Sequence, residues 1–220
     1  MGNKVAVLFL ALLGSFLGVF GQSVTIGTID AGPYGTGSSI AVSVKINDLE
    51  GKLKTNNVFK LYISDVNTSF LSPIEIGTYP GFYTTFINGV IPAGLVPGDY
   101  KVIVKYADGT LTSEASNSFK VIANNRITAD IDANVLQKLS DSPKTFGVCK
   151  PETKNVFRFS NISTAGAAVS ITATNEATAI SEIYNFNETP FAINADMAHY
   201  TLFVKATLNG TIGTKAFFLI

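Results

Sequence analysis

The sequence contains very few residues of the kinds that carry out chemistry. Among 220 residues there is one cysteine, one histidine and no tryptophan. A single cysteine, Cys149, excludes an intrachain disulfide, so the fold must depend on its hydrophobic core, where we expect Cys149 to lie as a small apolar residue. One histidine and one cysteine are too few for a Cys/His zinc site, and a Ser-His-Asp triad would have to use His199, inside an apolar strand-like run. We expect no catalytic residues, no metal and no cofactor, and therefore no enzyme.

Clustered positive charge is also missing. The 16 basic and 16 acidic residues give no net charge, and no segment concentrates lysine or arginine. Because nucleic-acid binding requires clustered positive charge to displace counterions from phosphates, we exclude nucleic acid as a partner. The acidic residues are scattered, so no two of them stand out as the pair of a glycoside hydrolase. Other surface proteins and extracellular glycans remain as partner classes.

The N-terminal residues predict a secretory signal peptide at 1–21. Lys4 precedes an apolar run from Val5 to Leu13, and Val19 and Gly21 stand three and one residues before Gln22, where signal peptidase requires small or slender side chains. A retained membrane anchor needs about 20 consecutive apolar residues, whereas this run is shorter and interrupted by glycine. We therefore expect a secreted or cell-surface protein that begins at Gln22 and does not insert into the membrane after cleavage.

The remaining sequence alternates between apolar and polar residues with period two, as in 40–46 and 100–106. This pattern is typical of β-strands, and no ten-residue stretch shows a helical stripe. The dipeptides Asp108-Gly109 and Asn209-Gly210 fall between apolar strands and tolerate the positive φ angles of type I′ hairpin turns. Short strands with frequent turns indicate an all-β sandwich. We expect strands at 24–29, 39–46, 58–64, 73–78, 83–91, 98–106, 116–122, 126–133, 144–149, 155–161, 168–175, 182–186, 190–194, 199–208 and 211–219.

The chain repeats after about 100 residues, a common size for an immunoglobulin-like sandwich. Tyr100, Val104 and Lys105 recur as Tyr200, Val204 and Lys205, and each strand leads into a turn followed by threonine. We therefore predict two tandem immunoglobulin-like antiparallel β-sandwiches, at 22–123 and 124–220, joined at the polar segment 123–125. Tyr100 begins a strand after a turn, the position of a tyrosine corner, whose hydroxyl bonds back to the preceding loop. Tyr200 could do the same.

Several segments resemble exported proteins of the Bacteroidota. The stretches 57–65, 70–77 and 91–100 contain a strand ending in Ile-Ser-Asp, a Phe-Leu-Ser-Pro segment and an Ile-Pro-Ala-Gly run leading to a tyrosine; together they look like a module of large exported proteins. Residues 146–149, 161–166 and 200–220 are similar to a segment of gliding-motility-associated proteins. The resemblance implies surface-displayed immunoglobulin-like modules, often in adhesins. Such proteins usually end in a type IX secretion sorting domain, for which this chain has no room.

The densest aromatic patch lies at 78–86 and offers the candidate ligand contacts Tyr79, Phe82 and Tyr83. Exposed rings can stack on sugars, but aromatic side chains mostly fill cores, and the alternative is a core strand with Tyr83 or Phe86 pointing inward. Oxygen ligands for calcium are present in loops at Asp48, Glu50, Asp65 and Asn67, but they lack the spacing of a calcium loop.

These observations favour a non-enzymatic exported module that serves as a spacer or adhesive unit in a surface protein. The apolar run 217–220 ends without a polar tail, so we expect the chain to be the N-terminal part of a longer protein. One alternative is a carbohydrate-binding accessory module, for which the aromatic patch is the motive. Another is a small outer-membrane β-barrel, although barrel strands run about 9–11 residues and these are shorter.

Overall fold

The computed structural model describes residues 21–49, 51–81, 83–133, 137–141, 144–147, 155–157, 159–185, 191–193 and 199–220. Its secondary structure consists of strands, which confirms the predicted all-β class. No helix within the described ranges is long and apolar enough to cross a membrane. The predicted signal peptide, apart from Gly21, and Cys149 lie outside the described residues and stay predictions.

The N-terminal half forms a sandwich around one hydrophobic core. Antiparallel sheets β1–β3–β6 and β5–β4–β8 contribute its two layers. Along β4, every second side chain is buried and the others are partly exposed, as the period-two pattern predicts. The strands of this half are β1 (Ser23–Ile26), β2 (Tyr34–Gly35), β3 (Ser39–Asn47), β4 (Val58–Ile63), β5 (Ile74–Pro80), β6 (Phe86–Val90), β7 (Gly98–Tyr100), β8 (Val102–Tyr106) and β9 (Phe119–Ile122).

The C-terminal half has its own core, built on the antiparallel run β16–β15–β18–β19. Ile171, Leu202, Val204 and Phe217 are buried on one face of this run together with Phe146. The strands of this half are β10 (Ile131–Ala133), β11 (Gln137–Asp141), β12 (Lys144–Gly147), β13 (Asn155–Phe157), β14 (Phe159–Asn161), β15 (Ala168–Asn175), β16 (Ser181–Asn185), β17 (Phe191–Ile193), β18 (Tyr200–Leu208) and β19 (Thr211–Leu219).

One sheet continues from the second half into the first. β19 pairs in parallel with β2 through Ile212 and Tyr34, and β2 pairs in parallel with β9, giving the order β16–β15–β18–β19–β2–β9–β7. Ile212 accordingly belongs to the first core, although it lies far beyond residue 123. The two cores lie on either side of the joint 123–125, while the exact domain bounds 22–123 and 124–220 stay a prediction.

The predicted strands differ from the observed ones mainly where a strand changes its partner. The predicted strand 98–106 is divided, because β7 pairs with β9 whereas β8 pairs with β4. Within the predicted strand 126–133, only β10 is strand. The preceding backbone donates instead to serine side chains, from Ile127 N to Ser38 Oγ (2.8 Å) and from Ala129 N to Ser39 Oγ (2.9 Å). The strands β2 and β11 were not predicted. β2 has only two residues, and β11 is the polar segment Gln137–Asp141, so neither shows an alternating pattern.

The two predicted hairpin turns differ from each other. Asn209 (φ 51°) and Gly210 (φ 75°) both have positive φ, which confirms the type I′ turn between β18 and β19. At the Asp108-Gly109 turn, only Gly109 has a positive φ (77°), whereas a type I′ turn needs a positive φ at both residues, so the prediction of a type I′ turn there is wrong. The Asp108 carboxylate accepts hydrogen bonds from the Thr110 backbone N–H (2.9 Å) and hydroxyl (2.6 Å), which stabilises a different loop.

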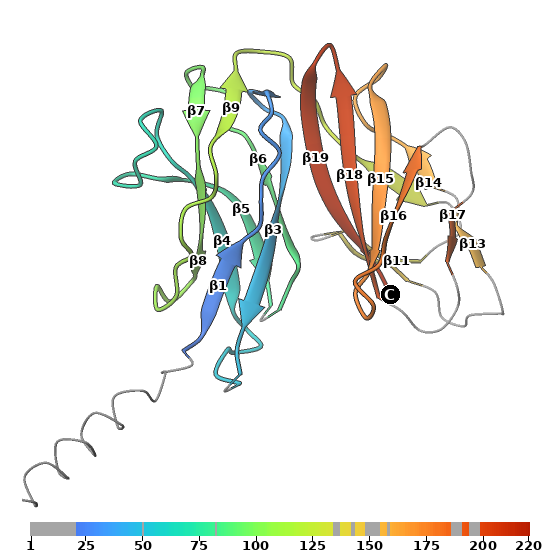
Figure 1. The fold of residues 1–220 in the computed structure, drawn as a ribbon, viewed down its shortest axis with the longest axis horizontal. Helices are drawn as coiled ribbons and strands as arrows, with labels where there is room; N and C mark the ends of the chain where they lie inside the picture. The colour runs from blue at the N-terminus through green and yellow to red at the C-terminus, as the bar shows by residue number, and fades with distance from the viewer. Residues whose placement is uncertain are drawn as a thin grey trace, which may run out of the picture.

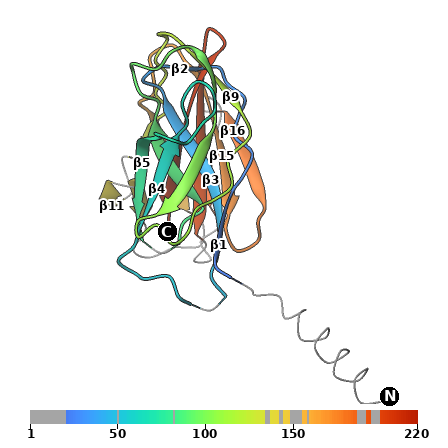
Figure 2. The same ribbon diagram turned by 90° about the vertical axis from the view of Figure 1, so that its left-hand side faces the viewer.

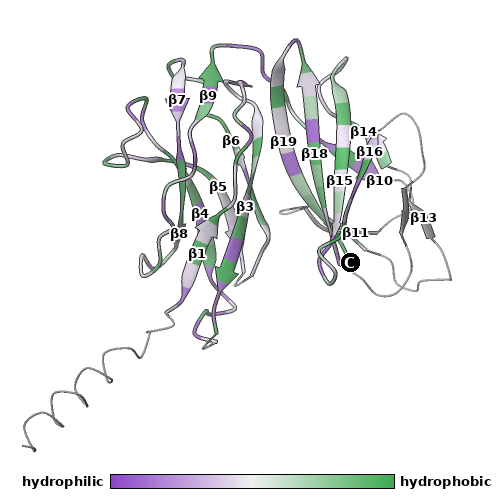
Figure 3. Cartoon of the chain, viewed as in Figure 1, coloured by the Kyte–Doolittle hydropathy of each residue, from purple (hydrophilic) through white to green (hydrophobic). Residues whose placement is uncertain are grey.

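The two halves lie side by side rather than end to end (Figure 1), and the view turned by 90° shows the strands of both running in roughly the same direction (Figure 2). Bands of hydrophobic and hydrophilic residues follow one another along β3 and β18 (Figure 3). Some residues of these two strands contact the other half of the molecule: Ala41 of β3 contacts Thr214, and Phe203 of β18 contacts Phe86. The two units therefore share one sheet and also meet through an interface between β3 and β6 of the first and β18 and β19 of the second.

Candidate functional site

The three predicted ligand contacts do not share one environment. Tyr79, on β5, is partly buried against the first core, and its ring lies 6.4 Å from that of Phe218 in an edge-on contact. Tyr83 is 57% exposed, and Phe82 lies outside the described residues. Of the two rings in the alternative prediction of a core strand with Tyr83 or Phe86 pointing inward, Tyr83 therefore lies in solvent, whereas Phe86, on β6, is partly buried. A ligand role for the three residues stays a prediction.

Of the four candidate oxygen ligands, Glu50 lies outside the described residues, and the other three lie in two separate loops. Asp48 accepts hydrogen bonds from Lys52 N and Leu53 N, in the loop before β4. Asp65 accepts from Asn67 N and Ser69 N in the loop after that strand. The six residues of β4 separate the loops by about 20 Å, so the two aspartates cannot share a cation. Within the described ranges, no three His, Cys, Asp or Glu residues are placed to hold a metal ion.

The main feature that sequence reasoning did not foresee is the interface between the units. The Asn88 side chain on β6 donates to Ala216 O (2.7 Å) and accepts from Ala216 N (2.8 Å) on β19. Nearby, the backbone N–H of Ala41 on β3 donates to the Thr214 hydroxyl at 2.9 Å. These contacts join backbone to side chain across the two sandwiches, and therefore fix how the sheets lie against each other.

The joint between the units is also held tightly. Asn124 (φ 61°) and Asn125 (φ 53°) both adopt left-handed conformations, which asparagine tolerates better than most residues. Their carbonyl oxygens approach Gly35 so closely that an added Cβ would lie 2.1–2.3 Å from them. Ser39 N donates to Ile127 O at 3.1 Å, in addition to the serine contacts described above. The predicted polar joint is thus a clamped segment rather than a loose linker.

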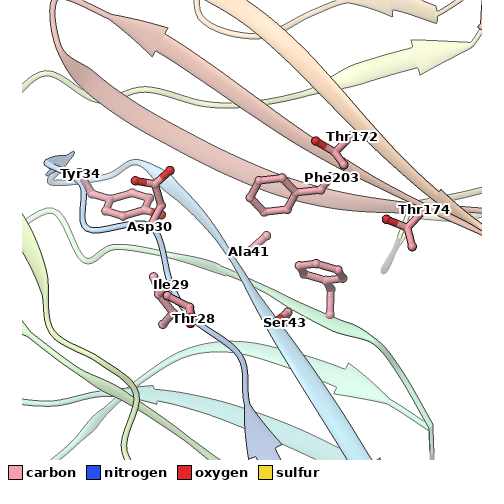
Figure 4. A pocket seen from close by; sticks show the side chains of 10 residues that line it. Thr28, Ile29, Asp30, Tyr34, Ala41, Ser43, Thr172, Thr174 and Phe203 are labelled. Atoms are coloured by element: carbon pink, nitrogen blue, oxygen red, sulfur yellow. The ribbon is translucent and has the colours of Figure 1, made fainter. Parts of the chain in front are cut away.

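Next to these contacts the interface opens into a cavity of about 260 Å³ (Figure 4). Each unit contributes one cross-strand pair of a phenylalanine and a hydroxyl residue: Ser43 faces Phe86 in the first, and Thr172 faces Phe203 in the second. The two phenylalanine rings meet across the interface, with centroids 5.6 Å apart and planes inclined by 35°. The cavity is lined by Thr28, Ile29, Asp30, Tyr34, Ala41, Ser43, Phe86, Thr172, Thr174 and Phe203.

One ion pair borders this cavity. The Asp30 carboxylate accepts a hydrogen bond from Lys205 Nζ, which lies on β18 two residues after Phe203. Burial raises the pKa of the Tyr34 hydroxyl still further above physiological pH, where a tyrosine is already a neutral phenol. Asp30 is the only charged residue among those that line the cavity. The arrangement offers aromatic faces and hydroxyl groups, but no nucleophile activated by a neighbouring base.

A sequence signal for this site existed but was ambiguous. In the pattern of β3, Ala41 and Ser43 occupy the positions between core residues, where a solvent-facing strand would carry charged or larger polar groups. Small residues at such positions permit close approach of a second sheet, but they are equally compatible with solvent. The partners of β3 lie far along the chain, so only the tertiary structure identifies them.

Comparisons with known proteins identify no family for this chain. No protein-family model and no curated protein matches it. Among solved structures, it is similar to the BSP domain of a biofilm-associated protein, with a TM-score of 0.34 and 14% identity over 89% of this chain and 30% of that one. It is also similar to the FN1–FN3 domains of chicken CNTN1, with a TM-score of 0.30 and 12% identity over 90% of this chain and 67% of that one. The chain spans less than a third of the biofilm-associated structure, and at these scores no functional assignment follows.

Proposed function

We propose that this protein is an exported, non-enzymatic module of a cell-surface protein, in which two immunoglobulin-like sandwiches act as one rigid spacer or adhesive unit. The observation that carries the proposal is the interface between the units. The paired Asn88–Ala216 hydrogen bonds, the Ala41–Thr214 hydrogen bond and the clamped joint together fix the mutual orientation of the units. A fixed orientation is what a spacer requires, since a flexible joint would not hold a distance.

The sequence supports the location of this module. The predicted signal peptide directs it out of the cytoplasm, and the absence of disulfides and of clustered charge fits a neutral structural unit. Its resemblance to exported Bacteroidota proteins supports a place near the N-terminus of a longer protein, linked to gliding motility and type IX secretion. Its partners would be other surface proteins or extracellular glycans.

Small-angle scattering of residues 22–220 tests the rigid arrangement. We expect a compact particle whose distance distribution matches two sandwiches lying side by side. A longer distribution, with the signature of two bodies on a flexible link, would contradict the proposal.

The proposed export to the cell surface needs a separate experiment. We expect an antibody against residues 22–220 to label intact cells of the native organism, and N-terminal sequencing of the exported protein to begin at Gln22. Labelling only after cell lysis, or a retained Met1, would contradict export to the surface.

A further inference from the structure

We infer that the cavity between the two units binds a single neutral sugar ring, as the end or a branch of an extracellular glycan. The inference rests on the proposed rigid arrangement, because the cavity exists only while β3 and β6 face β15 and β18. It places the glycan contact at Phe86 and Phe203 instead of the exposed ring of Tyr83. Neither half of the chain contains this site by itself.

The size of the cavity fits one ring. Its volume of about 260 Å³ lies just below the roughly 300–1,000 Å³ typical of pockets for drug-sized ligands. Phe86 and Phe203 are both partly exposed, so apolar ring surface remains available to the C–H face of a sugar. Ile29 and Ala41 extend this apolar wall.

The polar groups of the cavity fit hydroxyl groups. Thr28, Ser43, Thr172 and Thr174 are among the residues that line the cavity, and a hydroxyl can both donate and accept. The Thr174 hydroxyl already shares a 2.8 Å hydrogen bond with Ser181 Oγ. The Asp30 carboxylate accepts hydrogen bonds only, as it does from Lys205. A polyol offers both donors and acceptors, with which the lining hydroxyls and the carboxylate can pair.

The charges exclude other ligand classes. No lysine or arginine lines the cavity, so a phosphate, sulfate or acidic sugar would bring its negative charge next to Asp30 without a counter-ion of its own. A cation would compete with Lys205, which already neutralises this carboxylate. A neutral ligand avoids both costs.

Nuclear magnetic resonance of ¹⁵N-labelled residues 22–220 tests the site, with free glucose, galactose, mannose, fucose and N-acetylglucosamine as probes at millimolar concentration. We expect at least one of these neutral sugars to shift amide signals at Asp30, Ser43 and Thr172. Glucuronic acid serves as the charged control and should shift none of them.

Two matched variants locate the contact. Thr172→Val keeps the β-branched shape but removes the hydroxyl, and we expect it to weaken binding by about fivefold, the effect of one lost hydrogen bond. Thr78→Val, at an exposed position on β5, should bind as the unmodified protein does. Ser43→Ala provides a second test in case Thr172→Val folds poorly.

The site is refuted if no neutral sugar shifts these signals, if Thr172→Val and Ser43→Ala bind with unchanged affinity, or if the shifts centre on Tyr83 instead. Because scattering measures the rigid arrangement without any sugar, absence of binding by a compact particle overturns this site and leaves the proposed function standing.

Discussion

At the scale of single residues, Tyr100 shows how one hydroxyl fixes a loop. The Tyr100 side chain is 1% exposed, and its hydroxyl donates a 2.6 Å hydrogen bond to Val96 O, which confirms the predicted tyrosine corner. Tyr200 differs, because its hydroxyl accepts a hydrogen bond from Asn175 Nδ2 and residues 194–198 before it lie outside the described residues. A second corner therefore stays a prediction.

We predict that Tyr100→Phe lowers the free energy of unfolding by about 1 kcal/mol, because it removes one buried hydrogen bond and leaves Val96 O without its partner. Denaturant titration measures the change. Tyr83→Phe is the matched control and should have no effect, since Tyr83 is 57% exposed. Equal stabilities of the two variants would argue against the corner.

The second residue-scale prediction concerns Asp108. The Thr110 hydroxyl and backbone N–H hold the pKa of the Asp108 carboxyl below its ordinary value. A lowered pKa in the folded state means that the unfolded state binds more protons at acidic pH, so this contribution to stability is present above about pH 4 and is lost as the pH falls further.

We predict that Thr110→Val, which removes the largest cause of the shift, moves the pKa of Asp108 upward towards its ordinary value. A ¹³C titration of the carboxyl group by nuclear magnetic resonance measures this directly. The pKa of Asp48, which backbone N–H groups of another loop hold low, should stay unchanged and serves as the internal control. An unchanged pKa of Asp108 would show that the backbone contact alone is sufficient.

At the scale of elements, the hairpin β18–β19 is important because it contributes to both cores. Leu202, Val204 and Phe217 on one face of the hairpin are buried in the second core, and Ile212 is buried in the first core. The turn that sets its register contains Gly210 at φ 75°, where a Cβ is disfavoured. The correct pairing of Tyr200 with Leu219 at the far end depends on this turn.

We predict that Gly210→Ala lowers the free energy of unfolding by about 1 kcal/mol, because an alanine must adopt the left-handed conformation there. No neighbouring atom lies within 4 Å of the added Cβ, so the cost is conformational and not steric. Gly94→Ala, which has equal space and no positive φ, is the control and should be neutral or slightly stabilising. Thermal melts distinguish the two.

At the scale of the whole molecule, the interface decides whether the two sandwiches behave as one body. The Asn88 amide satisfies both the N–H and the C=O of Ala216, so its removal leaves two backbone groups without that partner. The hydroxyls of Thr85 in the first unit and Thr201 in the second lie 2.9 Å apart and add a further hydrogen bond across the interface. We expect contacts of this kind to couple the folding of one unit to that of the other.

We predict that residues 22–220 unfold in one cooperative transition and that Asn88→Ala lowers its free energy by about 2 kcal/mol, roughly 1 kcal/mol for each lost hydrogen bond. Calorimetry is the measurement. Asn67→Ala, in the exposed loop after β4, is the matched control and should leave the free energy of unfolding unchanged. Two separate transitions in the unmodified protein would contradict the coupling.

The sequence by itself determined the local structure. Alternation with period two places one side of a strand in a core whatever its partner is, so β3, β4, β15, β18 and β19 lie close to their predicted positions. The corner at Tyr100 and the turn at Asn209-Gly210 were also predictable, because they depend on side chains and φ angles within a few residues. All these features arise from short-range interactions.

Only the tertiary structure decided which surfaces meet. The parallel pairing of Ile212 with Tyr34, the two hydrogen bonds between Asn88 and Ala216, and the cavity between Phe86 and Phe203 join residues more than 100 positions apart. A strand pattern distinguishes core from surface, but it does not distinguish surface that faces solvent from surface that faces another sheet. That choice depends on the shape and hydrogen-bonding groups of both faces together, and no single segment of the sequence contains them both.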